Sequence, residues 1–135
     1  MSLFNKASDE IKLDSKYCKS LLPLRGEDFS KADCGNVLII AGFSGMVGAA
    51  YMASFSALRS GSGLVRVLTS DLGTIPMQCL LPEAICVSED EAFSHLDSFD
   101  AIAIGPGMGV SDKTASLIRR VCENFSGPIV IDADG

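Results

Sequence analysis

The sequence has few basic side chains, one histidine and no long apolar segment, and these shortages exclude whole classes of protein. Its 11 basic and 17 acidic side chains give a net charge of −6. Such a chain lacks the cationic surface that follows a nucleic-acid backbone, so we expect no nucleic-acid partner. No stretch approaches the roughly 18 to 20 unbroken apolar residues of a membrane-spanning helix, and the first residues lead into no secretory segment. We therefore expect no membrane partner and a cytoplasmic location.

Cysteine occurs in an odd number and without paired spacing. The five residues are Cys18, Cys34, Cys79, Cys86 and Cys122. No two of them form a C-x-x-C motif, so neither a disulfide framework nor a zinc site is indicated. We expect reduced cysteines that serve mostly in packing.

Apolar side chains are abundant, at 47% of a chain of 135 residues. This length corresponds to about one domain, and the composition is sufficient for a hydrophobic core. Four short apolar runs show no polar alternation, which is typical of strands buried on both faces of a parallel sheet. The runs are residues 37–41, 64–69, 101–104 and 128–131. A further strand is predicted after Pro82, within residues 80–88.

Two helical segments alternate with these runs. Residues 49–60 are rich in Ala, Met and Leu, and residues 111–124 place Leu117, Ile118 and Val121 on one face. This alternation predicts an α/β fold, with helices on both faces of a mostly parallel sheet in a three-layer α/β/α arrangement. We expect residues 1–33 to form an N-terminal arm with a short helix at 14–22, and residues 34–135 to form the α/β domain.

Glycine clusters follow two of the predicted strands, at residues 42–48 and 105–109. Ligands of open parallel sheets bind at the carboxyl ends of the strands, where glycine turns let backbone N–H groups approach a phosphate. We expect the first cluster to suit a pyrophosphate and the second to form another anion nest. Neither is the G-x-G-x-x-G fingerprint, so close packing remains the alternative explanation for these glycines.

Three aspartates also stand at predicted strand ends. Asp132 and Asp134 follow the last strand, where they suit either Mg²⁺ or a sugar hydroxyl, or the capping of a loop. Asp71 follows the second strand, where a Rossmann fold places its ribose-binding acid. We interpret Asp71 instead as a helix N-cap.

Taken in order, a series of motifs between Leu21 and Gly135 resembles the ADP/ATP-dependent NAD(P)H-hydrate dehydratases, members of the ribokinase-like superfamily. The motifs are Leu-Leu-Pro-Leu-Arg (21–25), Ser-Lys (30–31), Gly-Asn-Val-Leu-Ile-Ile-Ala-Gly (35–42), Gly-Met-Val-Gly-Ala-Ala (45–50), Ala-Leu-Arg-Ser-Gly-Ser-Gly-Leu-Val (57–65), Leu-Pro-Glu (81–83), Ile-Gly-Pro-Gly-Met-Gly (104–109) and Ile-Asp-Ala-Asp (131–134). Their order is much more specific than any single glycine loop.

The resemblance implies a metabolite-repair lyase. Such an enzyme takes the S epimer of NAD(P)HX, the hydrated form of NADH or NADPH, and phosphorylates its ring hydroxyl with ATP or ADP and Mg²⁺. It then eliminates phosphate to regenerate NAD(P)H. In the family, residues matching Ala49, Gly105 and Gly107 line the substrate pocket, and we add Gly48, Gly109 and Asp132 to the predicted substrate-binding set. The resemblance also implies a homo-oligomer.

The chain departs from the family in two places. It reads Ser30-Lys31-Ala32 where family members often read His-Lys-Gly. The family's His-Pro-Gly-Glu stretch, Lys-Gly nucleotide loop and Gly-Thr-Gly-Asp loop with the catalytic aspartate lie beyond Gly135. We therefore assign no catalytic residue and no metal ligand within the chain. We expect the N-terminal half of a ribokinase-like domain, unable to turn over alone and with an exposed apolar sheet edge.

Three alternatives remain open. A ribokinase-like kinase for a vitamin precursor or a sugar shares the same sheet and loops. A dinucleotide-binding module would hold intact NADH through residues 42–48 and Asp71. An inactive structural or regulatory subunit would need a second polypeptide.

Overall fold

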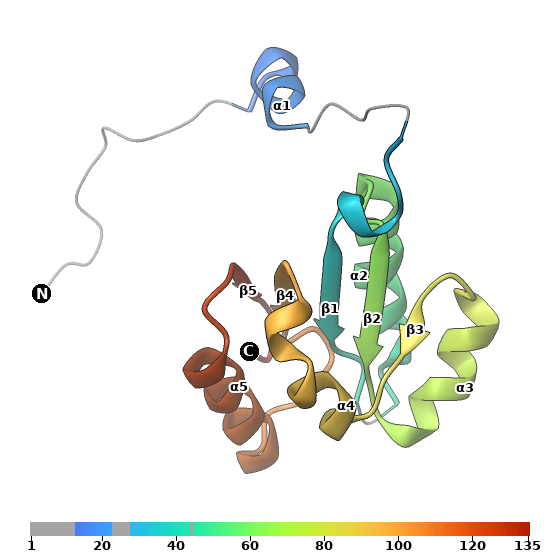
Figure 1. The fold of residues 1–135 in the computed structure, drawn as a ribbon. Coiled ribbons are helices and arrows are strands. Elements are labelled where there is room, and N and C mark those ends of the chain that lie inside the picture. The colour runs from blue at the N-terminus through green and yellow to red at the C-terminus, as the bar shows by residue number, and fades with distance from the viewer. Residues whose placement is uncertain (1–12, 23–27, 44) are drawn as a thin grey trace, which may run out of the picture.

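A computed structural model describes residues 13–22, 28–43 and 45–135 of the chain. Its centre is a five-stranded sheet in which every neighbouring pair is parallel, in the order β3-β2-β1-β4-β5 (Figure 1). The strands are β1 (Asn36–Ile40), β2 (Leu64–Leu68), β3 (Ile85–Cys86), β4 (Ala101–Ile104) and β5 (Ile129–Ile131). The predicted parallel sheet is confirmed, including the short strand after Pro82.

The helices form a layer on each face of the sheet. The helices of these layers are α2 (Val47–Ser60), α3 (Asp71–Leu80), α4 (Glu89–Ser94) and α5 (Asp112–Asn124). A further helix, α1 (Ser15–Leu21), belongs to the N-terminal region, and 3₁₀ turns occur at Ala32–Cys34 and Leu96–Ser98. Side chains of α2 and α3 share one apolar cluster with the sheet, and those of α4 and α5 share the other. The three-layer α/β/α arrangement is therefore confirmed. No helix in the described part of the chain is long and apolar enough to cross a membrane.

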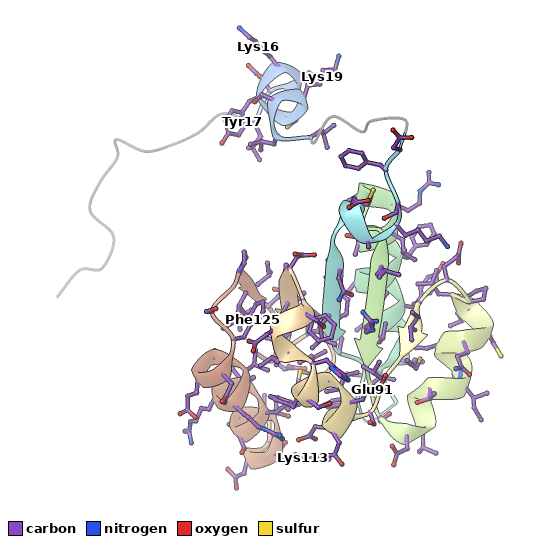
Figure 2. The ribbon with its side chains drawn as sticks, viewed as in Figure 1. Lys16, Tyr17, Lys19, Glu91, Lys113 and Phe125 are labelled. Atoms are coloured by element: carbon purple, nitrogen blue, oxygen red, sulfur yellow. The ribbon has the colours of Figure 1, made fainter. Side chains whose placement is uncertain are left out.

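Alternate residues of the central strands supply the two halves of the core. On one face, Ile39 of β1 packs in the cluster that contains Ala50 of α2 and Met77 of α3. On the other face, Ile40 packs in the cluster that contains Val121 and Phe125, the latter labelled in Figure 2. Because β1 has strands on both sides and helices on both faces, its residues 38–40 are buried.

Our sequence reading is wrong about the burial of β5. The side chains of Val130 and Ile131 are 62% and 49% exposed. The physical reason is position, since β5 is an edge strand that pairs only with β4. The continuous apolar run was therefore not a sign of burial on both faces here. It gives the exposed apolar edge that we expected.

The reading also misses two helices, α3 and α4, and places the start of α2 two residues late. Gly73 and Pro76 lie inside α3 and weaken its helical pattern. Gly73 is buried because its backbone packs on Thr69, whose Oγ1 would lie 2.7 Å from an added Cβ. The segment is thus a helix because of tertiary packing rather than propensity.

The N-terminal region contains the predicted short helix. Asp14 caps α1 by accepting a hydrogen bond of 2.8 Å from the Tyr17 N–H, and no residue of α1 is buried. Pro23, which directly follows the predicted helix of residues 14–22, falls outside the described residues. Further along, Gly63 donates a backbone hydrogen bond of 3.0 Å to the Cys34 carbonyl, which holds the 3₁₀ turn against the start of β2. The division at residues 33 and 34 remains a prediction.

Two isoleucine substitutions test where the stability resides. Ile40→Ala should lower the free energy of unfolding by about 2 to 5 kcal/mol, because Ile40 is fully buried in the central strand. Ile75→Ala, at a side chain that is 72% exposed on α3, should change it by less than about 0.5 kcal/mol. Urea unfolding followed by circular dichroism measures both. Equal losses in the two variants would contradict this assignment of the core.

Candidate functional site

The candidate site lies where the direction of the chain through the sheet reverses. From β1 the chain passes through α2 to β2 on one side, whereas β4 lies on the other side of β1 and leads into α5 (Figure 1). In doubly wound sheets the loops at this switch point diverge and leave a ligand-binding crevice. Here the two loops are the predicted glycine clusters after β1 and β4.

The two loops contact each other directly. The Gly42 N–H donates a hydrogen bond of 2.9 Å to the Pro106 carbonyl. A Cβ added at Gly107 would lie 2.9 Å from the Cβ atoms of both Ala49 and Met46. The fold thus brings the predicted residues Ala49 and Gly107 together, although they are far apart in the sequence.

Some glycines of these loops are required by packing. Gly105 has a φ of +125°, and an added Cβ would lie 1.8 Å from the Asp132 carbonyl oxygen. At Gly42 an added Cβ would lie 2.7 Å from that of Ala50. The close-packing explanation therefore accounts for these two positions without a ligand.

Gly48 and Gly109 differ, because an added Cβ would meet no atom within 4 Å at either position. Gly109 has a φ of +73°, which itself favours glycine, whereas Gly48 has no left-handed φ. Neither packing nor backbone conformation explains the glycine at Gly48, in the first turn of α2. The missing side chain leaves room there for a ligand to approach the backbone.

The aspartates after β5 take different roles. Asp134 accepts a hydrogen bond of 2.8 Å from the Gly109 N–H, and the left-handed Ala133 (φ 53°) turns the chain toward that loop. Asp134 is thus a loop cap, and the Gly109 amide is not free for the anion nest that we predicted. The exposed Asp132 side chain makes no hydrogen bond with the described residues. Within the described ranges no group of three His, Cys, Asp or Glu side chains is placed to hold a metal.

A cavity of about 560 Å³ adjoins the switch point, between the loops that follow β1, β2, β3 and β4. Its volume is within the range of small-molecule sites. Its apolar side chains are Phe43, Leu68, Val87 and Met108. Its polar side chains include Thr69, Ser70, Asp71, Glu89, Ser111 and Lys113. None of the six residues predicted to bind substrate lines this cavity, which we call the switch-point pocket.

Our interpretation of Asp71 is wrong in one respect. The N-cap of α3 is Ser70, and Asp71 is the first residue of the helix. Its position directly after β2 was visible in the sequence. The sequence reading missed its place in the pocket because α3 was not predicted, so nothing showed which residue began the helix.

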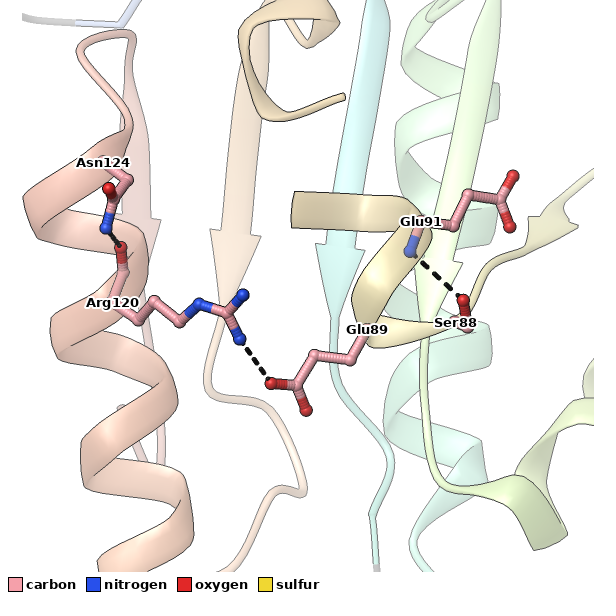
Figure 3. Close-up of polar contacts among 5 residues, drawn as sticks. All are labelled: Ser88, Glu89, Glu91, Arg120 and Asn124. Atoms are coloured by element: carbon pink, nitrogen blue, oxygen red, sulfur yellow. Dashed lines mark hydrogen bonds and ion pairs between the residues drawn. The ribbon is translucent and has the colours of Figure 1, made fainter. Parts of the chain in front are cut away.

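Several polar groups of the pocket already have partners within the chain. Glu89 forms an ion pair of 2.8 Å with Arg120 (Figure 3). The guanidinium of Arg120 lies 3.7 Å from the ring centroid of Phe93. Ser88 caps α4 by accepting a hydrogen bond of 3.2 Å from the Glu91 N–H. Ser111 caps α5 through the Thr114 N–H at 3.1 Å. These groups hold the helix starts in place.

The thiol of Cys86 lines the pocket and is half-buried. Burial raises the pKa of its thiol, because desolvation penalises the thiolate. Its Sγ lies 3.8 Å from the Thr74 carbonyl. At neutral pH Cys86 is therefore a protonated packing residue and not a nucleophile.

Comparison with known proteins decides the family. Residues 37–135, which include both glycine loops, match the family described as NAD(P)H-hydrate dehydratase. The chain belongs to this family. The resemblance noted in the sequence is thereby confirmed.

Individual relatives of the dehydratase family agree. The ADP-dependent (S)-NAD(P)H-hydrate dehydratase of Listeria monocytogenes is 31% identical over 129 residues, which covers 92% of this chain and 47% of that protein. The bifunctional NAD(P)H-hydrate repair enzyme Nnr of Escherichia coli is 38% identical over 106 residues, covering 77% of this chain and 20% of that protein. The chain thus spans about half the length of the first relative and less of the second.

Solved structures show the same fold. The ADP/ATP-dependent NAD(P)H-hydrate dehydratase of Bacillus subtilis, co-crystallized with ATP/Mg²⁺, superposes with a TM-score of 0.73 at 27% identity, covering 88% of this chain and 44% of that one. A ribokinase-like superfamily protein of Enterococcus faecalis gives a TM-score of 0.80 at 26% identity, covering 90% and 44%. The ribokinase-like fold and the partial coverage that we expected are confirmed.

Substitutions of two glycines distinguish a position that packing requires to be glycine from a position with open space around it. Gly105→Ala should lower the free energy of unfolding by at least about 2 kcal/mol, because its Cβ would overlap the Asp132 carbonyl. Gly48→Ala should leave stability unchanged or raise it by up to about 1 kcal/mol, since alanine favours the helix. Urea unfolding of both variants is the measurement. A large loss in Gly48→Ala would show that its surroundings are not open.

Thiol labelling tests the state of Cys86. At neutral pH it should react with a maleimide more slowly than Cys79 and Cys122, which are exposed. The thiolate is the reactive form, and a raised pKa reduces its population. Mass spectrometry of the labelled peptides over time gives the rates, and labelling in urea should make them equal. Fast labelling of Cys86 in the folded protein would contradict its half-buried, protonated state.

Proposed function

We propose that the chain takes part in the nucleotide-dependent dehydration of the S epimer of NAD(P)HX, which regenerates NAD(P)H. The observation that carries this proposal is the family match over residues 37–135, with both glycine loops inside it. It favours dehydration over the kinase, binding-module and non-catalytic subunit alternatives. Curated relatives named as ADP-dependent and as ATP-dependent dehydratases both occur, so either nucleotide is a candidate donor.

The proposed reaction has two steps. A phosphoryl group passes from ATP or ADP to the hydroxyl oxygen on the hydrated nicotinamide ring, and that hydroxyl loses its proton. The carbon–oxygen bond then breaks with phosphate as the leaving group, and the ring loses a proton to restore the double bond of NAD(P)H. No external oxidant or reductant is required, because the overall change is the loss of water driven by nucleotide cleavage.

Within this reaction the chain's own residues bind and orient the substrate. The first turn of α2 carries backbone N–H groups that the helix does not itself satisfy, and Gly48 leaves them accessible to a pyrophosphate. Ala49 and Gly107 fix the contact between the two loops, and Gly105 packs on the backbone of Asp132 after β5. Gly109 leaves space beside them, and the unpartnered Asp132 carboxylate is assigned to a substrate hydroxyl.

The described residues do not form a metal site, and we derive no step through Mg²⁺. Any metal ion would accompany the nucleotide. No described residue is assigned to the transfer of a proton. The chain's part is therefore substrate binding.

We further propose that residues 1–33 form an N-terminal arm and that residues 34–135, which follow it in the sequence, form half of a ribokinase-like domain. The exposed Val130 and Ile131 of β5 support association with further polypeptide, including other copies of the chain. The five free cysteines support a reducing, cytoplasmic location.

The purified chain should not dehydrate hydrated NADH with Mg²⁺ and either nucleotide. A fusion that adds the second half of the Listeria relative after Gly135 should do so, as measured by the return of reduced-nicotinamide absorbance. In the active fusion, Gly48→Val should lower kcat/KM by about tenfold or more, because its side chain would fill the space above α2. Ser56→Val, at an exposed position on the same helix, should have no effect.

Two outcomes would contradict the proposal. Nucleotide-dependent turnover by the 135-residue chain alone would show that the second half is not needed. A folded fusion that leaves hydrated NADH unchanged but phosphorylates a small alcohol would support the kinase alternative instead.

A further inference from the structure

The switch-point pocket contains polar side chains that form no hydrogen bond or ion pair with the described residues. Glu89, Ser88 and Ser111 are occupied by the ion pair and the helix caps described above. Asp71 and Lys113, by contrast, make no hydrogen bond or ion pair with the described residues. The pocket thus holds one carboxylate and one ammonium group available to a ligand.

Ser70 is unusual among the three serine N-caps around the pocket. Ser88 and Ser111 each accept a hydrogen bond from a backbone N–H of their own helix, whereas the Ser70 side chain makes no capping hydrogen bond. Its hydroxyl is half-buried beside Asp71 at the end of β2. Ser70 and Asp71 therefore present a hydroxyl and a carboxylate side by side at the pocket wall.

Thr69 holds this wall in position. Its Oγ1 donates a hydrogen bond of 2.8 Å to the Gly42 carbonyl, which ties the end of β2 to the first glycine loop. Phe43, in the same loop, and Met108, in the other, contribute apolar atoms to the lining of the pocket, where Phe43 is half-buried and Met108 is buried. Lys113 lies near the start of α5 (Figure 2), where the positive end of the helix adds to its charge.

We propose that the switch-point pocket binds a ribonucleotide, with the Asp71 carboxylate accepting hydrogen bonds from the ribose diol. Ser70 hydrogen-bonds the same sugar, Lys113 pairs with the phosphate, and the base packs on the half-buried ring of Phe43. The inference rests on the proposed function, because it assigns to this pocket the adenosine half of hydrated NADH, whose ribose carries a free 2′,3′-diol. It also adds residues that the glycine loops alone did not indicate.

The test measures binding of AMP and of 2′-deoxy-AMP to the 135-residue chain by calorimetry, with backbone amide NMR to locate the ligand. AMP should bind more tightly than 2′-deoxy-AMP and should shift the amide signals of Ser70, Asp71 and Lys113 but not that of Val130. Asp71→Asn should weaken AMP binding by about tenfold or more and should remove most of the preference over 2′-deoxy-AMP.

Asp112→Asn is the matched control, because Asp112 is the first residue of α5 as Asp71 is of α3. Both substitutions remove one negative charge beside a helix start, so a loss of affinity confined to Asp71→Asn reports the missing diol acceptor. Ser70→Ala is a second variant that removes no hydrogen bond from the folded chain. It should weaken AMP binding severalfold without changing thermal stability.

Several results would overturn the inference. They are an absence of AMP binding at millimolar concentration, equal affinity in Asp71→Asn and wild type, and amide shifts confined to Gly48 and Gly109. Two further results distinguish a failure of the pocket proposal from a failure of the proposed function. If the active fusion dehydrates hydrated NADH and Asp71→Asn leaves its KM unchanged, the pocket proposal is overturned and the proposed function is not. Diol-dependent AMP binding to the chain, with no dehydration by the fusion, supports the pocket and overturns the proposed function.

Discussion

Where β1 and β4 end, the backbones of two loops touch, and the Gly42 N–H donates to the Pro106 carbonyl at 2.9 Å. This contact requires bare backbone at Gly107, because a Cβ there would lie 2.9 Å from the Cβ atoms of Ala49 and Met46 at the start of α2. The open first turn of α2 and the switch-point pocket both adjoin this contact, so their spacing depends on it.

The same residue type therefore serves two purposes within a few residues. Gly105 is glycine because the backbone of Asp132 is too close for any side chain, whereas Gly48 is glycine with empty space around it. A sequence pattern does not distinguish these cases. The two cases can be distinguished only when the neighbouring atoms are known. Glycine at Gly105 is required for folding, whereas glycine at Gly48 leaves the backbone surface accessible.

The central part of the fold was predictable because its signals are local. The unbroken runs of β1, β2 and β4 identify buried parallel strands, and α5 shows its apolar face in Leu117 and Val121. The sequence predictions fail where tertiary packing determines the local structure. β5 has the same composition as the buried strands but lies at an edge, and α3 contains Gly73 and Pro76, so its helix depends on packing against Thr69. The pocket was missed with α3, because Ser70 and Asp71 acquire their positions from that helix.

A chain with a net charge of −6 repels anions at long range, yet the family is named for a substrate that carries phosphate groups, the hydrate of NAD(P)H. The arrangement around the two loops resolves this conflict locally. Uncharged backbone at the start of α2 offers N–H groups without a side-chain cation, and the neighbouring pocket holds Lys113 with its Glu89 carboxylate already paired to Arg120. Because Glu89 is paired within the chain, Asp71 is the pocket carboxylate that has no partner among the described residues. Because a carboxylate attracts a diol and repels a phosphate, its place at the end of β2 orients a nucleotide with its sugar toward β2 and its phosphate toward α5.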